Sequence, residues 1–519
     1  MHRCLWLDDI VRPIAFELIA DGGQATAVSL ACSCKRFEDL VLDELWGVQD
    51  QLVPLLKILP GDIWNPGEYD VSPAITILIL SLLNRLNCKS LKRPPTKQEW
   101  DRLWIYAQKM QRLSSMDPWP LQVFSVLQFR TSGKPLLPNL RSLDLWYVTG
   151  DPIPFIPLVL SARTTTIDIM FSELGPHNVA TASMIANFPT FCPALREIRL
   201  ICLPRDPMMT AAVSELVLTT NQNTLRHFHA SSPLTEEAHE VIYRLPVLRE
   251  LWTVIVGPTL LPTMMLQNLT DIDVDYNHNH DWLQGFREAS LGKLASITIH
   301  SQSESIGDFL GAFESVALTT SIPTTLLKFR FHTDRSWEPR FRSLLPFTQL
   351  TTLLIDSNCE TGCSSTIDDD TITELAQAMP ELGVLQLCDR PCETPAGVTV
   401  KGLAALAYYC PRLSYLAIHF QVASLDPPEI PSPVSADEST VPREPCELRS
   451  LQAGHTRVPE ESALMVALTL INIFPCLEDI VYLDMGWERV ANAIQNSKRL
   501  ARCSSKKSMF VALRSSIDK

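Results

Sequence analysis

Four cysteines are the residues of this sequence whose type and spacing come nearest to a site for chemistry. They form two C-x3-C pairs, and four converging thiolates are a common way to hold zinc. Both pairs stand in loop-like stretches, however, and no histidine completes a familiar zinc pattern. We therefore predict that no metal is bound by Cys359, Cys363, Cys388 and Cys392.

A second candidate is the stretch His278-Asn279-His280-Asp281, which looks like a fragment of a metal or nuclease site. No further acids stand at a defined spacing from it, so we interpret it as a loop. The phosphate loop G-x-x-x-x-G-K-[ST], the nucleophile elbow G-x-S-x-G and the zinc helix H-E-x-x-H are absent from the sequence. We predict no enzymatic activity and no cofactor. A metal-dependent hydrolase that uses these histidines or the four cysteines is the alternative.

Length and composition indicate a folded chain that is too long for one ordinary core. The 519 residues are 46% apolar and 20% charged, which argues against overall disorder. A chain of this length forms several domains or an elongated repeat array. The net charge of −14 disfavours non-specific nucleic-acid binding, because neutralising phosphates takes clustered Lys and Arg. We therefore predict no nucleic-acid partner.

Three features predict a cytoplasmic or nuclear protein without a membrane partner. The longest apolar runs, 74–83 and 463–474, are shorter than the roughly 20 residues that span a bilayer. Asp8 and Asp9 stand where a signal peptide would need apolar residues. The 14 cysteines follow no compact framework, as is typical of reduced thiols in an intracellular chain.

One pattern returns from residue 137 onward: a leading residue, two variable residues, then two apolar residues separated by one position. It occurs thirteen times, about 28 residues apart on average, close to the period of leucine-rich repeats. Alternating apolar residues predict strands, and the intervals are long enough for the helical crossovers that parallel strands require. The leading residues are at positions 140, 164, 195, 225, 248, 269, 294, 326, 350, 382, 413, 448 and 477.

These units predict an α/β fold, in which stacked neighbours build the core that a single strand–helix unit lacks. We expect an irregular leucine-rich-repeat solenoid over 121–497, with parallel strands on the concave face and helices on the convex face. It should be irregular because the intervals vary from 21 to 35 residues. An ordinary α/β fold with similar buried strands is the alternative. Crossover helices are predicted at 235–245, 370–379 and 400–410.

The first fifty residues predict three short helices. Leu7, Ile10, Ile14 and Leu18 recur at helical spacing in the first, and Asp21-Gly22-Gly23 then predicts a turn. A generic helical cap for the repeat array is one interpretation. The second and third helices present apolar faces made of Ala27, Val28, Ala31 and Cys34, and of Phe37, Leu40, Val41, Leu45 and Trp46.

This segment resembles the F-box family, whose helical motif docks a receptor onto the Skp-type adaptor of a cullin–RING ubiquitin ligase. Two features depart from the family: its usual Leu-Pro opening is Leu7-Asp8 here, and the first turn lacks the typical leucine. The matching elements are Leu7, Ile10, Ile14, Cys34-Lys35-Arg36-Phe37 and Leu45-Trp46.

With the segments that follow, the resemblance extends to the fungal F-box/leucine-rich-repeat family. In that family an F-box, a helical connector and an irregular repeat domain follow in this order, and similar stretches occur here at 52–64, 93–113 and 135–146. The resemblance implies an F-box-like helical domain over 1–50 and a helical connector or N-terminal cap over 51–120.

The resemblance also implies a function, namely the substrate-recognition subunit of an SCF-type cullin–RING ligase. Its partners would be the Skp-type adaptor and an unknown protein substrate. The chain would raise the local concentration of substrate and form no thioester itself. A repeat scaffold without a ligase role is the alternative. The residues implied in adaptor binding are Leu7, Ile10, Ile14, Cys34, Phe37, Leu45 and Trp46.

A substrate would contact the strand residues that alternate with the apolar ones, because these point to the concave face. They are acidic in one strand, neutral in the next and basic in the one after, so a target of mixed charge would be oriented there. Two tryptophans would add apolar anchors. An ordinary solvated surface is the alternative. The candidate substrate-binding residues are Trp146, Trp252, Asp271, Asp273, Asp275, Lys328, Arg330 and His332.

Two stretches are predicted to lie outside the repeats. Residues 424–447, rich in Pro, Ser and acidic residues, hold too little apolar mass to offset their ordering entropy, so we expect a disordered insertion. Residues 498–519 carry seven Lys or Arg and one Asp, and we expect a solvated basic tail.

Overall fold

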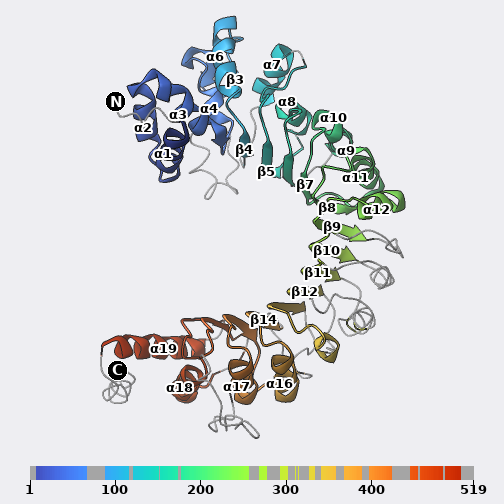
Figure 1. Ribbon diagram of the computed structural model, residues 1–519. Coiled ribbons are helices and arrows are strands. Elements are labelled where there is room, and N and C mark those ends of the chain that lie inside the picture. The colour runs from blue at the N-terminus through green and yellow to red at the C-terminus, as the bar shows by residue number, and fades with distance from the viewer. Residues whose placement is uncertain are drawn as a thin grey trace. The chain divides into compact units, whose positions relative to one another are not determined.

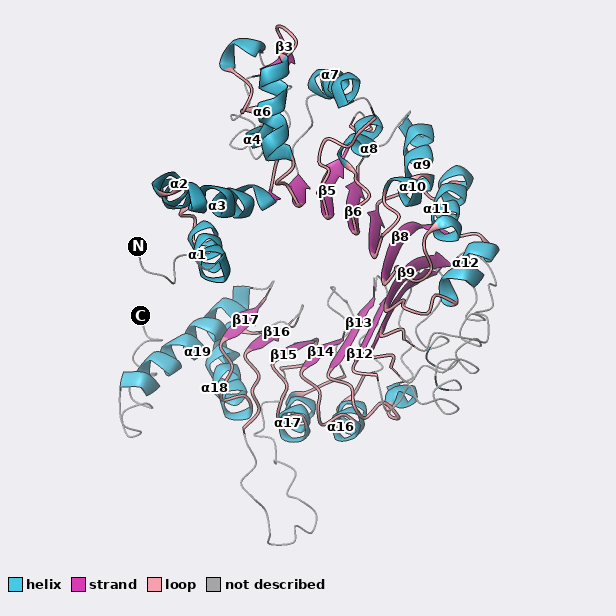
Figure 2. Ribbon diagram, turned by 45° about the horizontal axis from the view of Figure 1, so that its top comes forward, coloured by secondary structure: helices cyan, strands magenta, loops and turns pink. Residues whose placement is uncertain are grey.

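In the computed structural model the chain forms two compact units, Met1–Leu248 and Arg249–Lys519. In each unit, helices lie along one side of a parallel sheet (Figures 1 and 2). The structure describes residues 8–66, 88–115, 121–131, 133–150, 152–172, 177–255, 268–276, 293–301, 310, 314, 326–333, 341–357, 367–387, 397–422, 445–453, 456, 458–482 and 485–503.

The first unit begins with three helices and continues into a parallel sheet. The helices are α1 (Asp8–Ala20), α2 (Gln24–Ser33) and α3 (Lys35–Gly47). The sheet has the order β1-β4-β5-β6-β7-β8, and a separate antiparallel pair joins β2 (Trp64–Pro66) to β3 (Cys88–Leu91). The sheet strands are β1 (Val48–Gln49), β4 (Arg112–Ser115), β5 (Ser142–Val148), β6 (Thr166–Phe171), β7 (Glu197–Ile201) and β8 (His227–Pro233).

Helices connect most of these strands. They are α4 (Val53–Leu56), α6 (Lys97–Ala107), α7 (Leu121–Thr131), α8 (Ile156–Val159), α9 (Asn178–Ala186), α10 (Phe188–Phe191), α11 (Pro207–Thr219) and α12 (Glu236–Tyr243), with 3-10 turns η2 (Gly61–Ile63) and η3 (Ile153–Phe155).

The second unit is also a parallel sheet, in which the described strands follow one another in chain order. The strands are β9 (Glu250–Ile255), β10 (Asp271–Tyr276), β11 (Ser296–Ser301), β12 (Lys328–Thr333), β13 (Thr352–Ser357), β14 (Val384–Leu387), β15 (Tyr415–Ile418), β16 (Ser450–Gln452) and β17 (Asp479–Val481). The helices are η6 (Phe341–Leu344), α16 (Asp369–Ala378), α17 (Val400–Tyr409), η8 (Glu460–Ser462), α18 (Ala463–Ile473) and α19 (Met485–Cys503).

The predicted repeat architecture is confirmed. Each of the thirteen repeated patterns contains a strand, β5 to β17, and the pairings with neighbouring strands are parallel within each unit. The three predicted crossover helices are α12, α16 and α17. Alternate strand residues such as Leu385 and Leu387 are buried, while Val384 and Gln386, which alternate with them, are half-buried. The fold is therefore an irregular α/β leucine-rich-repeat solenoid.

Prolines set the ends of several crossover helices. The residue before each proline caps the helix and leaves the helical region, as at Met379 (φ −124°), Cys410 (φ −115°) and Phe474 (φ −123°). Proline disfavours helical backbone in the residue before it and cannot donate a helical hydrogen bond. All three capping side chains are fully buried. The chain thus turns into the next strand at a fixed point of the repeat.

Strands β1 and β4 were not predicted, although they extend the sheet toward the N-terminus. Val48 and Gln49 of β1 pair with Arg112 and Leu113 of β4. Only Leu113 is a buried apolar residue in this pairing, since Val48 is exposed. Two very short strands with one apolar residue on the core side carry no alternating pattern. The region predicted as a helical connector therefore contains strands as well as α4 and α6.

The three N-terminal helices share a small core, but its composition corrects the predicted apolar stripe of α1. Val11 and Ala15 are the buried residues of α1, with Leu18 packed beside them, whereas Ile14 is 42% exposed. The face at 11, 15 and 18 suits the close approach of α2, whose buried residues are alanines. The prediction that the face with Ile10 and Ile14 is the buried face of α1 was wrong, because smaller side chains let the helices pack more closely. Leu7 lies outside the described residues.

Helix α19 covers the C-terminal end of the second unit. Trp487 is fully buried, its Nε1 donates a hydrogen bond to the carbonyl oxygen of Thr456 at 2.6 Å, and its ring meets Phe420 edge-on. Residues 498–503, which were predicted to begin the basic tail, form the last turns of this helix, and 504–519 lie outside the described residues.

The predicted insertion is shorter at its C-terminal side than expected. Residues 445–447 are described, and Cys446 is buried between repeats, where its thiol contacts the carbonyl oxygens of Cys410 and Leu413. Residues 424–444 lie outside the described part of the chain.

Candidate functional site

The candidate substrate-binding residues of the second unit lie in register on the sheet face opposite the helices, here called the strand face. Parallel pairing aligns equivalent positions of successive strands into rows. The first row is Glu250, Asp271, Ser296, Lys328 and Thr352, the second is Trp252, Asp273, Thr298, Arg330 and Leu354, and the third is Val254, Asp275, His300, His332 and Asp356.

The acidic part of the strand face lies on β9 and β10. Glu250 and Asp271 are direct cross-strand neighbours, and the hydroxyl of Thr270 donates to the Oδ2 atom of Asp271 at 2.7 Å. Like charges at opposed positions repel each other. Trp252 is half-buried and is the cross-strand neighbour of Asp273. This corner of the face therefore combines carboxylates with an aromatic ring.

The basic part lies on β12, two strands away. Lys328 and Arg330 are both exposed. Lys328 has Ser296 and Thr352 as its cross-strand neighbours, and Arg330 has Thr298 and Leu354. All four neighbours are uncharged, so neither cation is neutralised by the residues that flank it in its row.

Two histidines connect the acidic and basic parts in the third row. The rings of His300 and His332 stack with centroids 4.7 Å apart and an interplanar angle of 7°. Nε2 of His300 lies 3.3 Å from Oδ1 of Asp273, and Nδ1 of His332 lies 3.5 Å from Oδ2 of Asp356. Each imidazole thus faces its own carboxylate on a different strand, and parallel stacked rings do not converge on one ion. His300 and Asp356 were not among the candidate residues, although they occupy the same position in their repeats as the candidates Asp275 and His332.

The strand face of the first unit carries two ion pairs between neighbouring strands. Arg199 lies 3.6 Å from Asp168, and Arg112 lies 4.0 Å from Asp144. Burial raises the pKa of Asp168, opposed by the nearby Arg199. Burial lowers the pKa of His229 to about 3, with a further contribution from Arg199. The charges here mainly satisfy one another.

The two tryptophans belong to different units. Trp146 is half-buried on β5 and Trp252 is half-buried on β9. We therefore assign Trp252, and not Trp146, to the strand face of the second unit.

The adaptor-binding candidates divide into buried and accessible residues. Phe37 is 5% exposed and belongs to the core of the three N-terminal helices. Ile10, Cys34 and Leu45 are partly buried, whereas Ile14 is exposed. Phe37 therefore holds the helices together, and Ile14 is the candidate with the most accessible side chain.

Trp46 packs toward the connector. Its ring lies 4.9 Å from that of Tyr106 on α6, and close by the ammonium group of Lys109 donates to Asp43 at 2.6 Å. These contacts join α3 to the segment that follows it. Phe16 (57% exposed) is an apolar residue that the sequence reasoning missed, because it lies outside the regular apolar stripe of α1. Val28 was predicted on the apolar face of the second helix but is 44% exposed, and the buried residues of α2 are Ala27 and Ala31.

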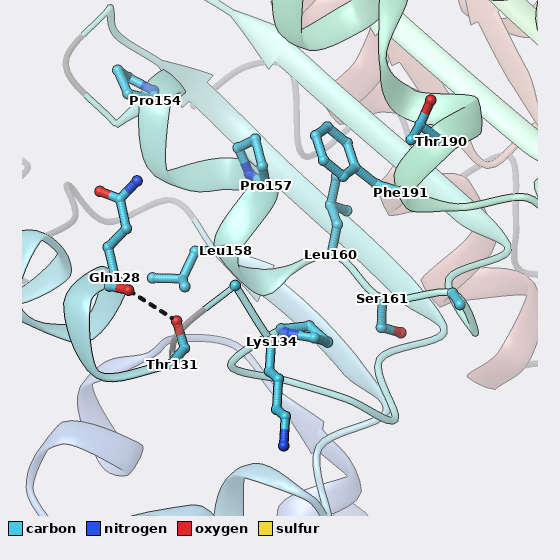
Figure 3. A pocket seen from close by; sticks show the side chains of 13 residues that line it. Gln128, Thr131, Lys134, Pro154, Pro157, Leu158, Leu160, Ser161, Thr190 and Phe191 are labelled. Atoms are coloured by element: carbon cyan, nitrogen blue, oxygen red, sulfur yellow. Dashed lines mark hydrogen bonds between the residues drawn. The ribbon is translucent and has the colours of Figure 1, made fainter.

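A pocket of about 390 Å³ lies on the helix side of the first unit (Figure 3). Pro154, Pro157 and Phe191 form apolar parts of its wall, and Lys134 is the charged residue of the lining. Thr131 in the wall donates its hydroxyl to the carbonyl oxygen of Gln128 at 3.2 Å. Ser161, also in the lining, donates its hydroxyl to the carbonyl oxygen of Leu140 at 3.0 Å.

Among the described residues, no group of three or more His, Cys, Asp or Glu side chains is arranged to hold a metal ion. Nor does any helix of that part of the chain combine the length and apolar character of a membrane span. The cysteine pairs at 359–363 and 388–392 and the stretch 278–281 lie outside the described residues.

Comparison with known proteins gives no family for this chain. No family model matches the chain, and no curated protein matches it. Among solved structures, the chain is similar to the leucine-rich repeat-containing protein LegL7 from Legionella pneumophila. That similarity has 9% sequence identity and a TM-score of 0.31, and it covers 67% of this chain and 98% of LegL7. The repeat architecture described above rests on the strand register and the spacing of the repeats.

Proposed function

We propose that this chain is the substrate-recognition subunit of an SCF-type cullin–RING ubiquitin ligase. In this proposal the N-terminal helices bind a Skp-type adaptor and the strand face of the second unit binds a protein substrate. The chain itself performs no catalysis and acts in the cytoplasm or nucleus.

The observation that carries the substrate-binding part is the pair of exposed cations on β12. Lys328 and Arg330 stand between uncharged neighbours on a broad sheet face. Charged side chains at such positions direct partner choice and encounter rate in protein complexes. A protein partner with complementary charge suits this face better than a small molecule, because the rows extend across several strands.

The adaptor-binding part is supported by the three-helix unit that precedes the repeats. Ile10 and Ile14 are one turn apart on α1, and Ile14 keeps 42% of its surface exposed. Amphipathic helices commonly bind partners through such apolar side chains in a groove. We therefore assign the Ile10–Ile14 side of α1 to the adaptor contact.

Co-purification of the full chain with a Skp-type adaptor tests the proposal. Ile14→Asp should abolish the complex, because a carboxylate cannot enter an apolar groove without a large desolvation cost. Phe16→Asp is the matched control, since position 16 lies about 200° around the helix from position 14. It places the same charge on α1 and should leave binding intact.

A repeat scaffold without a ligase role is the competing function. Equal adaptor binding by Ile14→Asp and wild type would contradict the contact assigned to α1. The scaffold would be favoured if the wild-type chain failed to bind the adaptor. Substrate binding by the strand face would then stand without the adaptor.

A further inference from the structure

We infer that the partner of the strand face is a protein segment carrying one basic and one acidic side chain about 10 Å apart. This inference deepens the proposed function, on which it rests, by defining the chemistry of the substrate. It concerns residues of β9, β10 and β12, which all belong to the second unit.

The basic side chain of the partner would bind at the corner formed by Glu250, Trp252, Asp271 and Asp273. Pairing in register places Glu250 opposite Asp271 and Trp252 opposite Asp273, so four side chains surround one position on the face. The carboxylates of Glu250, Asp271 and Asp273 would attract a cation to this position. The face of a tryptophan ring attracts a Lys or Arg side chain in addition.

The acidic side chain would bind at Lys328 and Arg330. Because the cross-strand neighbours of both residues are uncharged, a carboxylate from outside would be their ion-pair partner. Arg330 also offers two parallel hydrogen bonds to a carboxylate. Ser296 and Thr298 on β11 lie between the two sites in the first two rows, and His300 of the same strand lies 3.3 Å from Asp273.

The strand spacing sets the distance between the two sites. Strands β10 and β12 are two positions apart in the sheet, which corresponds to about 10 Å. A polyproline-II segment covers about 9 Å in three residues and returns its side chains to the same face, and a helix covers about 10 Å in seven. The partner motif is therefore a basic and an acidic residue with two positions between them in a polyproline-II segment, or six in a helix.

Synthetic peptides test the inference on the full-length chain. Each peptide series carries the charges at positions i and i+3, or at i and i+7 in a helix-favouring sequence, as Lys–Glu, Lys–Lys or Glu–Glu. Wild type should bind Lys–Glu about tenfold more tightly than either like-charged peptide, as measured by fluorescence anisotropy. Both peptide orientations are acceptable, so Glu–Lys should behave as Lys–Glu does.

Charge reversal of the protein should shift the preference in a defined way. Lys328→Glu with Arg330→Glu makes both sites acidic and should favour Lys–Lys. Asp271→Lys with Asp273→Lys should favour Glu–Glu. The milder pair Asp271→Asn and Asp273→Asn serves if the lysine variant fails to fold, and it should remove the advantage of Lys–Glu over Glu–Glu.

The control changes net charge by the same amount away from the face. Lys401 and Arg449 are exposed and lie outside the strand face of β9 to β13. Lys401→Glu with Arg449→Glu should keep the wild-type preference for Lys–Glu. A control that shifted the preference as strongly as the β12 variant would overturn the inference, because net charge would then be sufficient.

Failure of the inference is distinguishable from failure of the proposed function. Equal binding of the three charge patterns, or no measurable binding in either series, overturns the inference even if the chain binds the Skp-type adaptor. Loss of adaptor binding overturns the ligase role and leaves the peptide preferences to be judged separately. The β12 variant should bind the adaptor as wild type does.

Discussion

The carboxylate of Asp369 in one repeat caps the helix of the next repeat at Gly402. Its Oδ1 atom accepts hydrogen bonds from the backbone nitrogens of Gly402 at 2.9 Å and Thr399 at 2.7 Å, and its Oδ2 atom accepts one from the Thr399 hydroxyl at 2.6 Å. A Cβ atom on residue 402 would lie 2.7 Å from the same Oδ1 atom. A side chain on residue 402 would therefore displace the carboxylate from the N-terminus of α17, where it joins α16 to α17.

Asp369→Ala should lower the free energy of unfolding by about 1.5–3 kcal/mol, because hydrogen bonds to a charged acceptor are lost. Gly402→Ala should also destabilise, and the double variant should be less destabilised than the sum of the two. Urea unfolding of the three variants measures this. Asp370→Ala is the control, since Asp370 is exposed in the same turn. Fully additive effects would contradict the proposed contact.

Cysteine reactivity should separate surface thiols from those between repeats. Burial raises the pKa of Cys410 to about 12 and that of Cys446 to about 11, so neither forms the reactive thiolate near neutral pH. Cys32 and Cys202 are exposed. Iodoacetamide should label these two in the native protein, and Cys410 and Cys446 only after unfolding, as mapped by mass spectrometry. Rapid native labelling of Cys410 would show that the repeats open there.

The first unit should lose stability in mild acid through His239. Burial lowers the pKa of His239 from 6.5 to about 4, so the unfolded chain takes up a proton at higher pH than the folded chain does. The contribution of His239 to the free energy of unfolding is therefore fully present above pH 6.5 and is lost as the pH falls toward 4. The free energy of unfolding should be lower by about 3 kcal/mol at pH 4 because of this one group. Unfolding of the chain followed from pH 7.5 to pH 4 measures it.

His239→Leu removes the titrating group and should flatten this pH dependence. The ring of His239 stacks on Tyr243 at 5.8 Å, and the side chain is 3% exposed, so an apolar residue of similar size suits the site. An unchanged slope between pH 6.5 and pH 4 in the variant would assign the acid sensitivity to other groups.

The N-terminal helices should depend on Phe37 for stability. Phe37→Ala leaves a cavity in their core and should cost about 3–5 kcal/mol of local stability. Phe16→Ala at an exposed position should change it by less than about 0.5 kcal/mol. Hydrogen exchange of residues 8–47 in the full chain measures both. Equal protection in the two variants would contradict the packing described for Phe37.

Alternating apolar residues were sufficient to place thirteen strands and to assign the fold class. The reason is local, because a strand buried on one face needs an apolar residue at every second position, and each repeat contains this pattern. The same alternation identified the strand face, including Asp273 and Arg330, before any coordinates. Short strands such as β4 lack enough alternating positions to be found in this way.

The contacts between residues far apart in the sequence were determined only by the strand register and the packing of the tertiary structure. The sequence does not distinguish Arg199, which has Asp168 as its cross-strand neighbour, from Arg330, whose cross-strand neighbours are uncharged. Only the alignment of the strands determines which side chains are adjacent. The contact of Asp369 with Gly402 joins residues of two repeats, and its geometry depends on how two helices stack. Composition and periodicity act within a few residues of the chain, whereas these contacts arise only when separate repeats are brought together.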